Sequence, residues 1–221
     1  MNRRYKRYIQ IGEFVSSVPG FTLCGWSLSP PVFRSVRESI PGMDGDVDCS
    51  ELLTGRVQYN NRTLTATLEL SEKNRMYRKT VIDKMMNELD GKNQHIILPD
   101  DPHLYLNGRV QIAPQYNDAA HAAVKITAVC DPWRYAKQET LFIIENTAGP
   151  QNTTVRNQGR RAVCPFFTVS SSCNITVGTV THEITDAGTY QYDDIIFSHG
   201  NTVVRHSGNG TLQIRFREGW L

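Results

Sequence analysis

Three aspartates at alternate positions, Asp44, Asp46 and Asp48, have the spacing closest to that of a chemical site. A D-x-D-x-D pattern begins many calcium loops, because calcium prefers carboxylate oxygens as ligands. An EF-hand loop also needs glycine at its sixth position and glutamate at its twelfth, where this chain has Cys49 and Gly55. The pattern therefore fails as a calcium site, and we expect no metal.

Other residues that could perform chemistry are scattered or lie in turns. Asp100 and Asp101 could act as an acid–base pair, but between Pro99 and Pro102 they are expected to be turn residues. The six histidines show no HxH or HExxH spacing, and no GxSxG nucleophile motif is present. The five cysteines lack CxxC spacing, which is typical of free thiols. We expect no cofactor and no enzymatic activity.

The first half of the chain is expected to combine strands with one helix. Residues 63–70 alternate between apolar and polar side chains, and Asn60-Asn61 ahead of them predicts a hairpin with residues 56–59. Residues 74–90 have helical periodicity and end at Gly91, with a core stripe of Tyr77, Val81, Met85 and Leu89 that Ile82 and Met86 widen.

The second half shows only short strands separated by glycine-rich turns, which is typical of a β-sandwich. We expect a domain boundary near residue 138, with domains at 1–138 and 139–221. The predicted fold is mainly β: an N-terminal β-sandwich with one α-helix and a β-hairpin, followed by a second β-sandwich.

Composition excludes several classes of protein. The net charge is only +2, and no run of about 18 apolar residues could span a membrane. The four basic residues at positions 3 to 7 could bind phosphate, although a solvated or docked first segment is the simpler interpretation. No secretion signal follows them, so we expect a chain made in the cytoplasm, with no membrane insertion.

The order of the motifs is the most informative feature. P-G-M-D-G at residues 41–45 is followed by Y-N-N-R at 59–62, and L-D-G-K lies at 89–92. D-D-P at 100–102 precedes Y-L-N-G-R-V at 105–110, and C-D-P-W follows at 130–133. In this order and spacing the motifs resemble the distal tail protein (Dit) family of siphophages and related prophages. The second half, with N-Q-G-R at 157–160, C-P-F at 164–166 and the closing residues 210–221, resembles that family's galectin-like domain.

This resemblance implies a structural protein of the virion at the distal end of the phage tail. The larger domain would form a homohexameric ring around a channel that passes DNA and the tape measure. One face of the ring would dock on the major tail tube protein and the other would receive the tail-associated hub protein. The galectin-like domains would point outward to receptor-binding or baseplate proteins. The small net charge agrees with a conduit that does not bind nucleic acid specifically.

Two arginines are the candidate contact residues, because each follows a turn and opens a strand. Arg62 and Arg109 could lock a loop by bidentate bonds to carboxylates or carbonyls. The candidate acceptors are Asp44, Asp46, Asp100 and Asp101. We predict structural or intersubunit salt bridges between these residues, and no catalytic role. Gly42 and Gly45, around the acidic turn, allow backbone angles that other residues resist.

Two other function classes remain open. A carbohydrate-binding tail-tip or baseplate protein would need an exposed aromatic ring beside polar groups, and Trp220, Tyr190 and Tyr192 are the candidates in the second half. A tail-tip hydrolase would need a paired catalytic motif, and the sequence contains none that we recognise.

Overall fold

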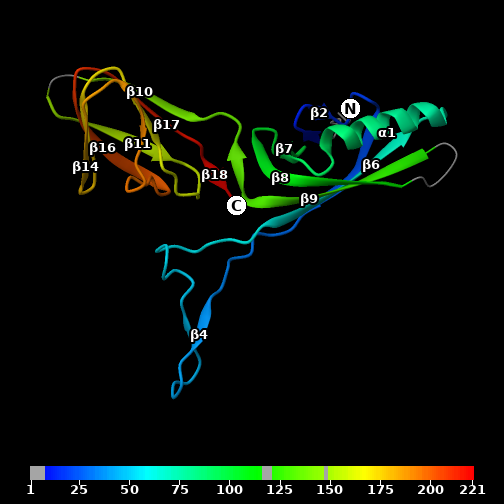
Figure 1. Cartoon of the computed structure of the whole chain (residues 1–221), viewed down its shortest axis with the longest axis horizontal. Coiled ribbons are helices and arrows are strands. Elements are labelled where there is room, and N and C mark those ends of the chain that lie inside the picture. Colours follow the sequence, from blue (N-terminus) through cyan, green and yellow to red (C-terminus); the bar gives the residue numbers. More distant parts are fainter. Residues whose placement is uncertain (1–7, 116–120, 147–148) are drawn as a thin grey trace, which may run out of the picture. The chain divides into compact units, whose positions relative to one another are not determined.

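The computed structural model describes residues 8–115, 121–146 and 149–221. The chain divides into two compact units, Met1–Arg134 and Tyr135–Leu221 (Figure 1). The basic residues at positions 3 to 7, proposed above for phosphate binding or docking, lie outside the described residues. In the part that is described, no helix is long and apolar enough to cross a membrane.

The first unit is built on a curled sheet with the strand order β2-β1-β7-β8-β9-β6-β3, and β18 also pairs with β9. The strands of this path are β1 (Gln10–Ile11), β2 (Phe14–Val15), β3 (Phe21–Leu28), β6 (Arg62–Ser71), β7 (Asn93–Ile97), β8 (Leu104–Gln115) and β9 (His121–Ala136). Phe14 and Phe21 belong to the two end strands, yet their ring centroids are only 6.2 Å apart. The sheet therefore curls until its ends meet.

Helix α1 (Arg75–Leu89) covers the apolar face of this sheet. Asn74 caps it, because its side-chain oxygen accepts hydrogen bonds from the backbone N–H groups of Met76 and Tyr77 at 3.0 and 3.2 Å. The buried apolar helix residues are Ile82, Met85 and Leu89. The expected stripe is thus partly wrong: Ile82, Met85 and Leu89 are buried as expected, but Tyr77 is exposed.

The segment between β3 and β6 is a long arm that leaves the sheet on the side away from α1 (Figure 1). It carries β4 (Arg37–Ser39) and β5 (Asp46–Asp48), which pair only with each other. The turn between them contains Gly42 and Gly45 at φ of +85° and +78°, so the prediction for these two glycines is confirmed.

The hairpin expected at Asn60-Asn61 is wrong. Residues 56–59 do not pair with β6, whose two neighbours are β3 and β9. Tyr59 instead makes an isolated bridge to Phe33, and the Asn60 N–H donates to the Val32 carbonyl at 2.8 Å. Both contacts hold the returning side of the arm against its outgoing side.

The second unit is a β-sandwich of two four-stranded sheets. One has the order β10-β17-β12-β15, with β10 (Thr140–Asn146), β12 (Phe166–Val169), β15 (Gly188–Gln191) and β17 (Gly210–Phe216). The other has the order β11-β16-β13-β14, with β11 (Gln151–Asn157), β13 (Cys173–Val177), β14 (Val180–Ile184) and β16 (Gly200–Gly208). Between the sheets lies an apolar core that includes Phe167, Ile175, Phe197 and Ile214. The expected mainly β fold, with its single helix among the described residues, is confirmed.

The last strand of the chain pairs with strand β9, which contains residues of both units. Strand β18 (Gly219–Trp220) pairs with β9, and the Ala136 N–H donates to the Glu218 carbonyl at 3.0 Å. The last residues are therefore held by the segment that opens the second unit.

Candidate functional site

Arg62 closes the base of the arm. Its Nε donates to the carbonyl of Ser29 at 2.8 Å, where the arm leaves β3. The Ser29 N–H donates to the Thr63 carbonyl at 2.9 Å, and the Thr63 N–H donates to the Ser29 hydroxyl at 2.8 Å. The outgoing and returning sides of the arm are thus joined at one point. Arg62 makes its part of this contact with a carbonyl group and not with a carboxylate.

The Arg62 guanidinium is buried without a carboxylate among its described partners. Arg62 is only 6% exposed, and no described group accepts a hydrogen bond from its buried Nη1. Burial lowers the pKa of Arg62, and the neighbouring charge of Arg134 lowers it further. A buried donor without an acceptor is destabilising. A hydrogen-bond acceptor placed next to Arg62 Nη1 would therefore stabilise the base of the arm.

The D-D-P and C-D-P-W motifs meet beside the base of the arm. Asp101 accepts a hydrogen bond from Arg134 Nη1 at 2.5 Å, which ties the turn after β7 to β9. The Trp133 ring meets the Tyr59 ring edge-on, with centroids 5.5 Å apart. Residues far apart in the sequence, from the arm, the turn and β9, therefore form one cluster, which we call the arm-base cluster.

Arg109 lies apart from the arm-base cluster and locks the turn that follows α1. Its Nη1 donates to the Gly91 carbonyl at 2.5 Å, and the Gly91 N–H donates to the Val110 carbonyl at 2.8 Å. Asp90 completes the contact, since its side chain accepts from the Ile112 N–H at 2.7 Å. The L-D-G-K and G-R-V motifs thus hold each other, with Gly91 at φ +71° making the turn possible.

The four candidate acids take different positions. Asp44 and Asp46 are exposed on the β4–β5 hairpin, and Asp100 is exposed in the turn after β7. Asp101 alone of the four has an arginine partner among the described residues, and that partner is Arg134. Within one chain, none of them pairs with Arg62 or Arg109 in the described part. A contact between copies stays a prediction.

Gly108 shows why the Y-L-N-G-R-V motif needs a glycine. A Cβ atom there would lie 2.6 Å from Cys130 Sγ and 3.0 Å from the Val129 carbonyl oxygen. Cys130 is fully buried, and burial raises the pKa of its thiol to about 11, so it is a protonated core group.

Gly108→Ala should lower the free energy of unfolding by about 1–3 kcal/mol, because the added methyl group forces β8 and β9 apart. Gly25→Ala, also on this sheet but with nothing within 4 Å of its Cβ position, is the matched control. Chemical denaturation of both variants tests this. Equal stability of the two variants would contradict the close packing described here.

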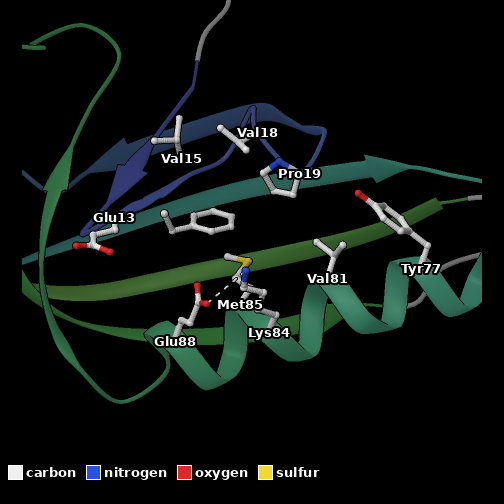
Figure 2. A pocket seen from close by; sticks show the side chains of 10 residues that line it. Glu13, Val15, Val18, Pro19, Tyr77, Val81, Lys84, Met85 and Glu88 are labelled. Carbon is white, nitrogen blue, oxygen red and sulfur yellow. Dashed lines mark ion pairs between the residues drawn. The ribbon is translucent and has the colours of Figure 1, made fainter.

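A groove lies between α1 and the β1–β2 hairpin, with a volume of about 560 Å³. Figure 2 shows apolar side chains facing each other across it: Val15, Val18 and Pro19 from the hairpin side, and Tyr77, Val81 and Met85 from the helix. Glu13 and the ion pair of Lys84 with Glu88, 3.7 Å apart, lie toward one end. The groove is apolar with charges on its rim, which suits a protein ligand.

The arm exposes large apolar residues of its own. Val32, Phe33 and Val36 are exposed ahead of β4, and Ile40 and Met43 are exposed in the turn between β4 and β5. Leu52 and Leu53 are 79% and 96% exposed on the returning side. Several exposed large apolar side chains on one projecting segment are typical of an interaction surface. Neither the groove nor this surface was predicted from the sequence, although the adjacent leucines in an otherwise polar stretch were a visible signal.

Among the described residues, two of the three aromatic candidates for a sugar platform, Tyr190 and Tyr192, stack in the second unit. No group of three potential metal-ligating side chains occurs in the described part of the chain. One face of the Tyr192 ring is covered by His182, at 3.7 Å between centroids, and Tyr190 stacks parallel to it at 6.4 Å. His182 is held in turn by Asp194 at 2.8 Å. These rings pack on one another at the edge of the sandwich.

Comparison with known proteins shows a similarity of fold to a solved structure. Neither a protein-family model nor a curated protein sequence matches the chain. Among solved structures, it is similar to the crystal structure of the phage SPP1 Dit protein (gp 19.1), described as a paradigm of hub adsorption apparatus in phages that infect Gram-positive bacteria. The TM-score is 0.71, and the match covers 96% of this chain and 98% of the other.

The chain has a Dit-like fold. The sequence identity is only 15%, so the likeness concerns the fold. Because the match covers both units, the Dit-like fold includes the curled sheet with its helix and the second sandwich. The resemblance drawn from the order of the motifs is confirmed at this level.

Proposed function

We propose that this protein is a structural component of a phage tail tip that forms a hexameric ring. The observation that carries the proposal is the Dit-like fold over 96% of the chain. In this proposal the ring joins the major tail tube protein to the tail-associated hub protein, and its partners include the tape measure and receptor-binding or baseplate proteins. The protein has no enzymatic role and is located in the virion, at the distal end of the tail.

The uncovered face of the curled sheet supports a central channel. Thr65 and Thr127 are cross-strand neighbours on β6 and β9, as are Thr67 and Lys125, and all four point away from the core. This face has small hydroxyl side chains and few cations. Six such faces around a channel would give DNA few ionic contacts, as passage requires.

In this proposal the two units have different roles. The first unit would form the ring, since it carries the arm, the arm-base cluster and the groove. The second unit would be the peripheral galectin-like domain that receives attached proteins. We place the functional boundary between residues 134 and 138, where β9 passes from one unit to the next.

The mass of the particle in solution tests the ring. Six copies of the 25.0 kDa chain give about 150 kDa, which light scattering separates clearly from a monomer. We expect a particle of that mass and, in electron micrographs, a ring with a central hole. A 25.0 kDa particle at every concentration would contradict the proposal, and so would an open filament.

A further inference from the structure

Strand β10 of the second unit lies at the edge of its sheet and lacks the features that usually protect an edge. It is the end strand of the order β10-β17-β12-β15, and β17 is its one partner among the described strands. The pairing with β17 runs in unbroken register from Thr140 to Asn146, without a bulge, and the strand contains no lysine or proline. Edge strands of natural proteins commonly use these features to prevent further pairing. The N–H and C=O groups on the outer edge of β10 are therefore available to another strand.

The side chains of β10 are apolar on both faces and incompletely covered. Leu141 and Ile143 on the outer face are 50% and 62% exposed. Phe142 and Ile144 pack against the core of the sandwich, yet both are only partly buried, whereas Ile214 on the neighbouring β17 is fully buried. The apolar core is thus open along this edge. A strand added beside β10 would cover apolar groups on both faces.

The edge of the other sheet shows the contrast. Strand β11 also has seven residues and lies at the end of its sheet. Its exposed side chains, Asn152, Thr154 and Arg156, are polar, and its apolar side chain, Val155, is fully buried. The remaining end strands of the sandwich, β14 and β15, have only five and four residues. A long, apolar and open edge therefore occurs at β10 and not at β11.

The charges along β10 define the strand that matches it. Glu139, just before β10, pairs with Arg215 and Arg217 at 3.4 and 3.1 Å. Glu145, at the far end of the apolar run, is exposed and has no ion pair among the described residues. Because β10 contains no lysine or arginine, pairing with β10 of a second copy would leave Glu145 without a cation in any register. Pairing in parallel register would even place two Glu145 side chains opposite each other, which is destabilising.

We propose that β10 accepts an extended segment of another protein as a fifth strand of its sheet. Main-chain hydrogen bonds would hold the segment, as in other cases of strand addition. The segment runs antiparallel to β10, has apolar side chains beside residues 141–144 and carries lysine or arginine opposite Glu145. This inference rests on the proposed role of the second unit in receiving attached proteins, and it specifies the surface that receives them.

A synthetic peptide tests the edge in the full-length chain. The probe is the capped, fluorescein-labelled peptide Gly-Lys-Val-Ile-Val-Leu-Gly, whose lysine lies opposite Glu145 in the antiparallel register. We expect saturable binding, measured by fluorescence anisotropy. Ile143→Lys should weaken binding by at least about tenfold, because it adds a cation to the apolar edge. Val203→Lys is the matched control, since Val203 is 54% exposed on the other sheet, and it should change binding less than about twofold.

Methylated peptides separate strand addition from simple apolar adhesion. One peptide carries N-methyl groups on its two valines, and the other carries them on lysine, isoleucine and leucine. Alternate N–H groups of a strand point to opposite edges, so one pattern should abolish binding and the other should preserve it. Equal binding of the two methylated peptides would overturn the inference.

A charge exchange tests the register. Glu145→Lys should weaken binding of the lysine peptide by about threefold, and a peptide with glutamate in place of lysine should recover it. Equal binding of the lysine peptide to the natural chain and to Ile143→Lys would overturn the inference. A fall in particle mass in Ile143→Lys would show that the edge pairs with a second copy, so the proposed occupant would be wrong.

The particle mass of the natural chain tests the ring separately. A ring that does not bind the peptide overturns this inference and leaves the ring standing. A monomer that binds the peptide with the expected methylation pattern overturns the ring and supports the edge.

Discussion

Replacing Asn157 with aspartate should unfold the second unit far below the temperature at which the natural chain unfolds. Asn157 is 1% exposed, and its side-chain N–H groups donate to the carbonyls of Arg161 and Phe197 at 2.9 and 3.0 Å. Its oxygen accepts from the Gly159 N–H at 3.0 Å. A carboxylate in this place would turn an oxygen toward two carbonyl oxygens and bury a charge without a counterion.

The expected loss is about 3–5 kcal/mol, as for other buried charges left unpaired. For a domain of this size, that lowers the unfolding midpoint by at least about 12 °C. Calorimetry of the full chain measures it. Asn201→Asp, an exposed asparagine on β16, is the matched control and should lie within about 0.5 kcal/mol of the natural chain.

The pH dependence of the Asn157→Asp variant gives an independent check. Burial would raise the pKa of the new carboxyl in the folded chain above its value in the unfolded chain. The folded state would then bind more protons, so the defect should shrink as the pH falls through the folded pKa. A midpoint within about 2 °C of the natural chain at neutral pH would contradict the role assigned to Asn157.

Replacing Arg62 with alanine should release the base of the arm and prevent ring formation. The change removes the bond from Nε to the Ser29 carbonyl and the packing of the buried side chain. We expect a loss of about 1–3 kcal/mol in unfolding free energy, because the removal of an unpaired buried N–H offsets part of the damage. Assembly should suffer more than folding, since the same defect recurs at each contact of the ring.

Light scattering against concentration checks the Arg62→Ala prediction. Arg62→Lys, which keeps the charge and one donor, should recover part of the assembly, and Arg205→Ala at an exposed position of the second unit should leave it unchanged. Arg109→Ala removes the lock on the Gly91 turn and is expected to weaken the ring to a smaller extent. Intact rings in both Arg62→Ala and Arg109→Ala would overturn the predicted contact role of these arginines.

Local patterns predicted much of the fold. The alternation in residues 63–70 corresponds to β6, and the short strands expected in the second half are present, among them β12 and β14. The helix begins and ends within a residue of the expected limits. These elements are determined by side chains close together in the sequence.

Elements that depend on distant contacts were the ones missed. Asn60-Asn61 has the composition of a tight turn, but β6 pairs with β3 and β9, and the turn is replaced by the arm. Residues 195–197 have the composition of a strand, yet Phe197 makes only an isolated bridge to Val163. Strand β15 contains few apolar residues and gave no signal, although pairing with β12 fixes it.

The candidate site shows the same limit. The sequence suggested loop-locking roles for Arg62 and Arg109 but did not indicate which groups accept their hydrogen bonds. The tight turn expected before Arg62 does not form. Asp101 pairs with Arg134, which lies 33 residues later and carried no distinguishing pattern. The groove likewise could not be predicted, because it exists only where the β1–β2 hairpin and α1 approach each other.

The pairing of β6 with β9 also has a consequence for synthesis on the ribosome. Leu64 pairs across the sheet with Ala128, so β6 leaves the ribosome long before the strand that covers one of its edges. At about 5–20 residues per second, that edge stays open for roughly 3–13 s. Its sequence, rich in threonine and leucine, favours strand pairing with any other open edge. When many copies are synthesised at once, open β6 edges of neighbouring nascent chains can pair with each other. The yield of soluble chain should therefore fall as the rate of synthesis rises.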